Sequence, residues 1–128
     1  MTAARQELGR AVERRVAERL AAAGWTIVDR NARTSELRGE LDLVALDGTD
    51  LVFVEVKARR AGSRLGPETP AMAVGRRKQA KLRSLAVAWL RDRDGDLPPH
   101  RGLRFDVVGV RVDATGRPIE WQHLRGAF

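Results

Sequence analysis

The sequence contains no cysteine, and only 5% of its 128 residues are aromatic. The absence of cysteine excludes thiolate zinc sites and disulfide bonds, and it is typical of proteins from a reducing compartment. No apolar run approaches the length of a membrane-spanning helix, and the N-terminus lacks the hydrophobic segment of a signal peptide. We therefore expect a cytoplasmic protein that has no membrane partner.

Motifs for several kinds of catalysis are also missing. The two histidines, His100 and His123, do not have the spacing of metal ligands, and no serine lies in a nucleophile elbow. The chain has no glycine-rich phosphate loop that ends in Lys-Ser or Lys-Thr, and it has no dinucleotide-binding fingerprint. What remains is a group of acids and a lysine in the middle of the sequence.

Positive charge is in excess, because 24 Lys and Arg residues stand against 17 Asp and Glu residues, giving a formal net charge of +7. An excess of this size on a small domain favours a nucleic-acid partner. Ordinary surface charge in an arginine-rich proteome explains the composition equally well. A length of 128 residues is typical of one packed core, so we expect residues 1–128 to form a single domain.

Residues 3–23 predict the first helix, because they are rich in Ala, Arg and Glu and are followed by Gly24, which suits a helix C-cap. Glu13 borders the apolar side of this helix, although a glutamate on an amphipathic helix is usually exposed. Residues 25–31 predict a strand, and the polar segment that follows reads as a basic, exposed loop. The side chains expected to face the core from the helix are Leu8, Ala11, Val12, Val16, Leu20 and Ala23.

Thr69-Pro70 predicts the start of a second helix, which ends near Arg91. Basic residues concentrate in its N-terminal half, where the helix macrodipole favours acids, so an anion-binding surface would explain them; a solvated face is the alternative. Lys78 lies on the inward side and is expected to reach towards the central acids; the alternative is a lysine whose stem lies along the edge of the apolar side with its charge in solvent. Strands are predicted at 103–112 and 119–124. The candidate nucleic-acid-binding residues are Arg33, Arg38, Arg59, Arg60, Arg76, Arg77, Lys78 and Lys81.

The central stretch from Gly39 to Lys57 predicts two short strands joined by a tight turn. A two-residue loop at Gly48-Thr49 suits a type II′ turn, and a loop at Asp47-Gly48 suits a type I′ turn. The first loop places Asp42 directly opposite Glu55, with Cβ atoms about 4.5–5.5 Å apart. The second loop makes the two acids diagonal neighbours on the same face. Only a loop of odd length would separate the two acids onto opposite faces. In the other arrangements two carboxylates and a lysine crowd one face, which a sequence tolerates if a cation, such as a metal ion, lies between the acids.

The order of these residues resembles a known superfamily. An Asp, followed by Glu-X-Lys on the next strand and preceded by a helix that carries a Glu, is similar to the PD-(D/E)XK nucleases. The closer similarity, over about residues 13–110, is to the YraN-like family of bacterial endonuclease-like proteins, and a more distant one is to archaeal Holliday-junction resolvases. The segments that carry it are Arg30-Asn31, Gly39-Glu40-Leu41-Asp42-Leu43, Phe53-Val54-Glu55-Val56-Lys57-Ala58-Arg59 and Arg104-Phe105-Asp106-Val107.

The resemblance implies a restriction-endonuclease-like α/β fold, with a three-layer α/β/α arrangement around a central mixed sheet in the order α-β-β-β-α-β. It implies that Asp42, Glu55 and the backbone carbonyl of Val56 bind a divalent cation, Mg²⁺ or Mn²⁺, and that Glu13 joins them directly or through a water. Lys57 would orient or help to deprotonate the attacking water and would offset charge in the transition state.

The leading interpretation is a metal-dependent endonuclease that hydrolyses phosphodiester bonds in DNA, with branched or damaged DNA as one substrate class. One alternative is a nucleic-acid-binding module that has the same fold and no turnover. Another is a structural role, in which Glu40 and Lys57 form a cross-strand ion pair and Asp42 is a turn residue. A junction-type nuclease would also allow a homodimer, although no apolar stripe demands one. The sequence departs from the superfamily pattern in one respect, because Glu40-Leu41 stands where the proline of the motif's name is expected.

Overall fold

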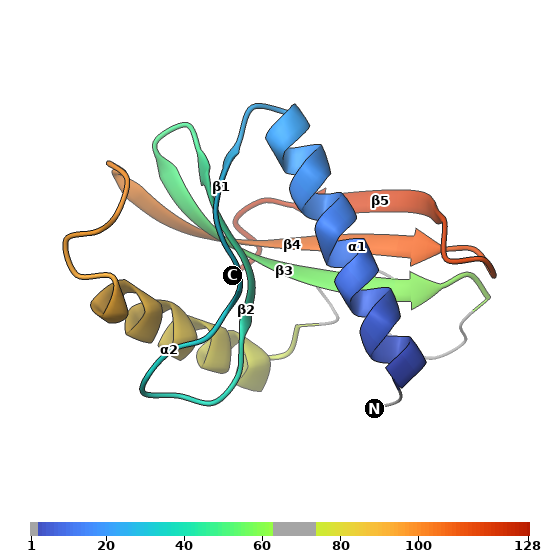
Figure 1. The fold of residues 1–128 in the computed structure, drawn as a ribbon, viewed down its shortest axis with the longest axis horizontal. Helices are drawn as coiled ribbons and strands as arrows, with labels where there is room; N and C mark the ends of the chain where they lie inside the picture. Colours follow the sequence, from blue (N-terminus) through green and yellow to red (C-terminus); the bar gives the residue numbers. More distant parts are fainter. Residues whose placement is uncertain (1–2, 63–73) are drawn as a thin grey trace.

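The computed structural model describes residues 3–62 and 74–128. These residues form two helices and five strands, and the elements follow one another in the predicted order (Figure 1). The elements are α1 (Ala3–Ala22), β1 (Thr26–Ala32), β2 (Leu41–Asp47), β3 (Asp50–Arg60), α2 (Arg76–Asp92), β4 (Gly102–Val112) and β5 (Pro118–Leu124).

The five strands form one open sheet in the order β1-β2-β3-β4-β5. Neighbouring strands are antiparallel except for β3 and β4, which are parallel. A parallel pair cannot be joined by a tight turn, and here the connection from β3 to β4 includes α2. The prediction of an α/β fold with a mixed sheet is therefore confirmed.

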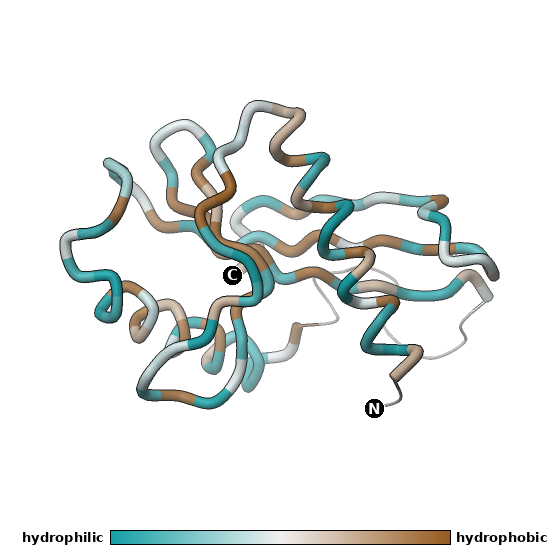
Figure 2. The backbone as a smooth tube through the Cα atoms, viewed as in Figure 1, coloured by the Kyte–Doolittle hydropathy of each residue, from teal (hydrophilic) through white to brown (hydrophobic). Residues whose placement is uncertain are grey.

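Buried side chains alternate along β3 between two hydrophobic clusters. Val52 and Val54 belong to the cluster that contains the buried residues of α1, whereas Leu51 and Phe53 belong to the cluster that contains those of α2. This alternation follows from strand geometry, since successive side chains point to opposite faces of a sheet. Figure 2 shows the hydrophobic residues running along the central strands.

Helix α1 buries one side against the sheet and crosses β3 and β4 in Figure 1. Its fully buried residues are Val12, Val16, Ala17 and Leu20, at the spacing of an amphipathic helix. The prediction that Ala23 also faces the core is wrong, because this residue follows the last helical turn and is exposed. Glu13 is half-buried at the border of the apolar side, as the sequence predicts.

The turn between β2 and β3 is formed by Gly48 and Thr49, because Asp47 pairs with Asp50 in the observed register. Gly48 has φ +60°, a left-handed conformation that glycine adopts without strain. The first of the two predicted loops is therefore the correct one. The register then continues through Leu43 opposite Val54, and one further step places Asp42 opposite Glu55.

Helix α2 begins later than predicted. The predicted start at Thr69-Pro70 lies outside the described residues, but Gly75 is extended, with φ −72° and ψ 172°, and Arg76 is the first helical residue. A helix that runs unbroken from residue 69 to residue 91 is therefore excluded. The predicted inward side is correct, since Val74, Leu82, Leu85, Ala86 and Trp89 are all buried.

The outer surface carries few large apolar side chains. Within the described residues, the exposed ones are Val87 on α2, Leu103 on β4 and Ile119 on β5. Neither described helix is both long enough and apolar enough to span a membrane. This finding agrees with the absence of long apolar runs from the sequence.

Candidate functional site

Two carboxyl groups meet where the pairing of β2 with β3 ends. Asp42 Oδ2 accepts a hydrogen bond from the backbone N–H of Val56 at 2.9 Å. The carboxylate therefore takes the place of a backbone carbonyl just beyond the last pair of the ladder, Leu43 with Val54. Glu55, the neighbour of Val56, is only 6% exposed.

This crowding changes the acidity of Asp42. Burial is the largest cause, followed by the nearby Glu55 carboxyl, and together they raise the pKa of Asp42 to about 9. The hydrogen bond from Val56 opposes the rise, and the negative charge of Glu13 adds to it. At neutral pH the protein therefore keeps a proton on Asp42 when no other cation offsets the charge of the acids.

One oxygen of Glu55 has no hydrogen-bond donor. Oε2 is buried, and its one close cationic neighbour among the described residues is Lys78, whose Nζ lies 3.3 Å away as an ion pair without hydrogen-bond geometry. The sequence-based expectation that Lys78 reaches the central acids is thus confirmed. A buried carboxylate oxygen without a donor is costly, so this atom is available to a better cation.

Glu13 approaches the acid pair from α1 and is held by β1. Asn31 Nδ2 donates a hydrogen bond to Glu13 Oε2 at 2.6 Å, and Arg10 Nη1 lies 3.7 Å from the same oxygen. Asn31 has φ +46°, which is uncommon for any residue other than glycine. Within the described residues, the other oxygen of Glu13 has no hydrogen bond. Asn31 therefore fixes the carboxylate by one oxygen and leaves the other free.

Glu13, Asp42 and Asn31 line a pocket of about 200 Å³. Three arginines, Arg10, Arg14 and Arg30, line the same pocket. The motif Arg30-Asn31 belongs to the resemblance described above, but none of these three arginines is among the predicted nucleic-acid-binding residues. No pattern in the sequence separates Arg10 and Arg14 from the other arginines of α1.

Lys57 lies on β3 two residues beyond Glu55, and the alternation of side chains places the two on the same face of the sheet. Its partner in β4 is Gly109, which has no side chain to compete for the space. Lys57 forms no ion pair with any residue that the structure describes. The alternative of a Glu40–Lys57 ion pair is wrong, because Glu40 pairs with Arg10 at 3.1 Å and with Arg33 at 3.2 Å.

The predicted nucleic-acid-binding residues lie on three elements. Arg76 and Arg77 are exposed in the first turn of α2, and Lys81 is exposed one turn later. Arg33 and Arg38 belong to the loop between β1 and β2, and Arg59 and Arg60 end β3. This loop lies against α2, since a Cβ added at Gly39 would meet Leu85 Cδ1 at 3.4 Å and Lys81 Cε at 3.5 Å.

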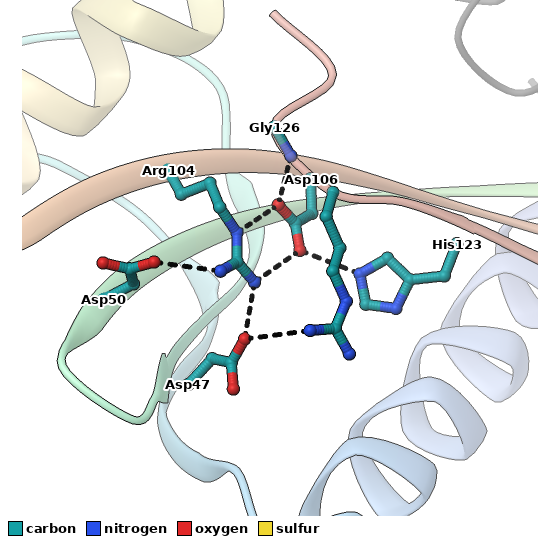
Figure 3. Close-up of polar contacts among 7 residues, drawn as sticks. Asp47, Asp50, Arg104, Asp106, His123 and Gly126 are labelled. Atoms are coloured by element: carbon teal, nitrogen blue, oxygen red, sulfur yellow. Dashed lines mark hydrogen bonds and ion pairs between the residues drawn. The ribbon is translucent and has the colours of Figure 1, made fainter.

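A second polar cluster, which the sequence did not reveal, surrounds Asp106 (Figure 3). Asp106 is fully buried and accepts hydrogen bonds from Arg104 Nε at 2.9 Å and from the backbone N–H of Gly126 at 3.0 Å. His123 Nε2 lies 2.8 Å from its Oδ2. Arg104 also bonds Asp47 and Asp50, at the tip of the β2–β3 hairpin.

The sheet separates the Asp106 cluster from the acid pair. Asp106 pairs with Val54, which belongs to the hydrophobic cluster of α1, whereas Glu55 pairs with Val107, which belongs to the cluster of α2. The two buried acids therefore face opposite sides, although their strands are neighbours. Every carboxylate oxygen of Asp106 has a partner, so this cluster is a structural tie.

The described residues contain no group of three or more acidic, histidine or cysteine side chains already placed to hold a metal ion. Two carboxylates are nevertheless sufficient for Mg²⁺, which usually keeps several waters and takes other ligands from a substrate phosphate. The buried, donor-free oxygen of Glu55 and the proton retained on Asp42 both fit such a cation.

The raised pKa of Asp42 leads to a prediction about stability. A group whose pKa is higher in the folded state than its unfolded value of about 3.9 makes the protein less stable as pH rises between those two values. In EDTA we expect Asp42→Asn, which keeps an acceptor for Val56, to be more stable than the parent by about 1–3 kcal/mol at the alkaline end of this window.

Thermal unfolding across this pH window measures the difference, and Asp94→Asn, at an exposed position after α2, serves as the control. The parent should lose stability towards alkaline pH, while Asp42→Asn should change little. An Asp42→Asn variant that is less stable than the parent at every pH would mean that the carboxylate only caps Val56.

The chain matches the model of the uncharacterised protein family UPF0102 over residues 12–110. It is 48% identical to a UPF0102 protein of Frankia alni over 127 residues, which cover 98% of this chain and 97% of the relative. It is also 48% identical to a UPF0102 protein of Streptomyces griseus over 123 residues, which cover 96% of this chain and 97% of the relative.

Proposed function

Because this chain belongs to the UPF0102 family, the YraN-like family, whose name states no activity, we propose a function from the site itself: a metal-dependent endonuclease that hydrolyses phosphodiester bonds in DNA. The observation that carries the proposal is the pair of crowded acids, Asp42 and Glu55, with a buried Glu55 oxygen that lacks a donor. A structural role alone does not account for this pair, since like charges placed opposite each other destabilise a sheet.

The residues present fit a divalent cation such as Mg²⁺ or Mn²⁺. Asp42, Glu55 and the backbone carbonyl of Val56 would hold it, and Glu13 would contribute its free oxygen directly or through a water. When bound, the cation would polarise the phosphoryl oxygen and offset the charge that develops on it. The carboxylates keep this charge in place, because backbone and amide hydrogen bonds fix the directions of Asp42 and Glu13.

Lys57 has the position of the residue that acts on the attacking water. It shares a face with Glu55, and no ion pair with a described residue consumes its charge. An ammonium group there would orient the water and stabilise the negative transition state.

The arrangement of the helices and the sheet supports membership of the PD-(D/E)XK superfamily. We infer that α1 and α2, whose buried residues fall in separate clusters, are the two outer layers of a restriction-endonuclease-like α/β/α arrangement. The site lies between them, at the end of the β2–β3 pairing, so both helices supply residues to it: Glu13 from α1 and Lys78 from α2.

Purified protein should cleave DNA only when a divalent cation is present. We expect cleavage of linear, nicked or four-way-junction DNA with Mg²⁺ or Mn²⁺ and none with EDTA, measured on denaturing gels. Asp42→Ala should reduce the rate by at least about a hundredfold, because even the partners of metal ligands are worth 10–100-fold. Asp94→Ala, at an exposed site after α2, is the matched control.

A metal titration followed by thermal unfolding gives a second readout. Mg²⁺ or Mn²⁺ should raise the Tm of the parent. At a cation concentration a hundred times the dissociation constant, the free energy of unfolding should increase by about 2.7 kcal/mol. The Tm of Asp42→Ala should not change. Cleavage that survives in Asp42→Ala would overturn the site. DNA binding without metal-dependent cleavage would favour a nucleic-acid-binding module instead.

A further inference from the structure

The pocket beside the acids has a cationic rim. Arg10, Arg14 and Arg30 line it together with two acids, Glu13 and Asp42. The arginines outnumber the carboxyl groups even when both acids are counted as charged. We call Glu13 and Asp42 the floor of this pocket and the three arginines its rim. Such a pocket suits an anionic ligand, which the arginines attract and which a cation bound by the acids would hold.

The three arginines differ in how they are used. Arg10 is occupied, because it bonds Glu40 at 3.1 Å and lies 3.7 Å from Glu13. Arg14 and Arg30 are exposed, and their guanidinium groups form no hydrogen bond or ion pair with any described residue. Two guanidinium groups thus border carboxylates without pairing to them. The planar guanidinium matches a phosphate with two parallel N–H donors, which a lysine ammonium does not offer.

A longer groove leads away from this pocket along α1. It has a volume of about 1050 Å³, shares Arg10, Glu13 and Arg14 with the pocket, and is bounded on the strand side by Glu40 and Ala58. The lining residues of α1 extend from 3 to 14, a distance of roughly 16 Å at 1.5 Å per residue. Phosphates of one strand follow one another at about 3.4 Å along a duplex axis, so the groove spans about four or five nucleotides.

The backbone of β1 contributes to this arrangement. Arg30 and Asn31 are consecutive, and both line the pocket, whereas consecutive residues of a regular strand face opposite sides. The left-handed conformation of Asn31, with φ +46°, interrupts that regularity. The same residue bonds Glu13 at 2.6 Å. The conformation of Asn31 therefore positions Glu13 in the pocket and places Arg30 beside it.

We propose that Arg14 and Arg30 bind phosphate groups of a DNA strand that lies along α1, so that a phosphodiester is held over Glu13 and Asp42. This assignment rests on the proposed function, since it describes how that site would receive its substrate. It differs from the surface that the sequence predicted, which consists of the loop after β1, the end of β3 and the start of α2. The strand enters from the α1 side of the molecule.

The test uses the full chain and a short fluorescein-labelled DNA duplex in EDTA, where metal-dependent cleavage stops. Arg14→Ala and Arg30→Ala should each weaken binding roughly three- to tenfold, measured by fluorescence anisotropy, and each should lower the slope of log affinity against log salt by about 0.9. Arg15→Ala is the matched control, because Arg15 is an exposed neighbour on α1 that does not line the pocket or the groove. Arg14→Lys should restore the salt dependence and only part of the affinity.

The outcomes separate this assignment from the proposed function. If the parent cleaves DNA with Mg²⁺ but both alanine variants bind as Arg15→Ala does, the assignment is overturned and the function stands. If both variants bind more weakly but the parent never cleaves, the function is overturned and the binding residues stand. If the parent does not bind DNA at all, both are overturned.

Discussion

Lys57→Met is expected to reduce metal-dependent cleavage of DNA by roughly 10²–10³-fold, the usual loss when one group that stabilises transition-state charge is removed. The reason lies in the position of Lys57, two residues beyond Glu55 on the same face and opposite Gly109. Methionine keeps most of the length of the side chain and removes the charge. Single-turnover cleavage with saturating Mg²⁺ measures the loss.

Binding measurements make this prediction specific. The Mg²⁺-induced rise in Tm should be almost unchanged in Lys57→Met, because the carboxylates that hold the cation remain. DNA affinity should also be close to that of the parent, since Arg14 and Arg30 are untouched. Arg15→Met, at an exposed position on α1 outside the pocket and the groove, is the matched control and should cleave normally. A Lys57→Met variant that cleaves at the parental rate would remove Lys57 from the proposed mechanism.

Much of the central hairpin could be predicted because its determinants are local. The turn at Gly48-Thr49 fixes the register, and the register alone brings Asp42 opposite Glu55. Lys78 could be placed for a similar reason, since helical periodicity puts it on the same side as Leu82 and so on the side that faces the sheet. These inferences need no knowledge of how distant segments meet.

The start of α2 shows how a local signal can mislead. Thr69-Pro70 has the chemistry of a helix N-terminus, but the described helix begins only after Gly75, whose extended conformation no side chain caps. Arg76, Arg77 and Lys78 therefore occupy the first turn itself, and no acid is present there. Glycine is a weak helix former, so the sequence did contain a reason to place the boundary later.

Other parts of the site depend on contacts between distant segments. The conformation of Asn31 and its bond to Glu13 join residues 18 positions apart. The tie between β1 and α2 joins residues farther apart, because Asp29 accepts hydrogen bonds from Trp89 and Arg93. A side chain such as Asn31 or Asp29 can bond many partners, and only the folded backbone selects one. The sequence therefore identified the acids but not the groups that orient them.

The same limit applies to Asp106, whose partners come from β4, β5 and the C-terminal segment. Burial alone would raise the pKa of Asp106, but hydrogen bonds from His123, Arg104 and Gly126 outweigh it, so the pKa lies below its usual value. A carboxylate with a lowered pKa stabilises the fold above its unfolded pKa of about 3.9, and this stabilisation is lost as pH falls through the lower folded value. The cluster should therefore contribute to acid unfolding.

Asp106→Ala is expected to destabilise the protein by about 3–5 kcal/mol, because several donors lose one fully buried, charged acceptor. Arg104 keeps its bonds to Asp47 and Asp50 at the hairpin tip, but its Nε, His123 Nε2 and the backbone N–H of Gly126 lose their partner. Urea unfolding at neutral pH measures the loss, with Asp94→Ala as the exposed control. Because the sheet separates Asp106 from Glu55, folded Asp106→Ala should still respond to Mg²⁺, and a variant that is fully stable but no longer responds would instead place Asp106 in the metal site.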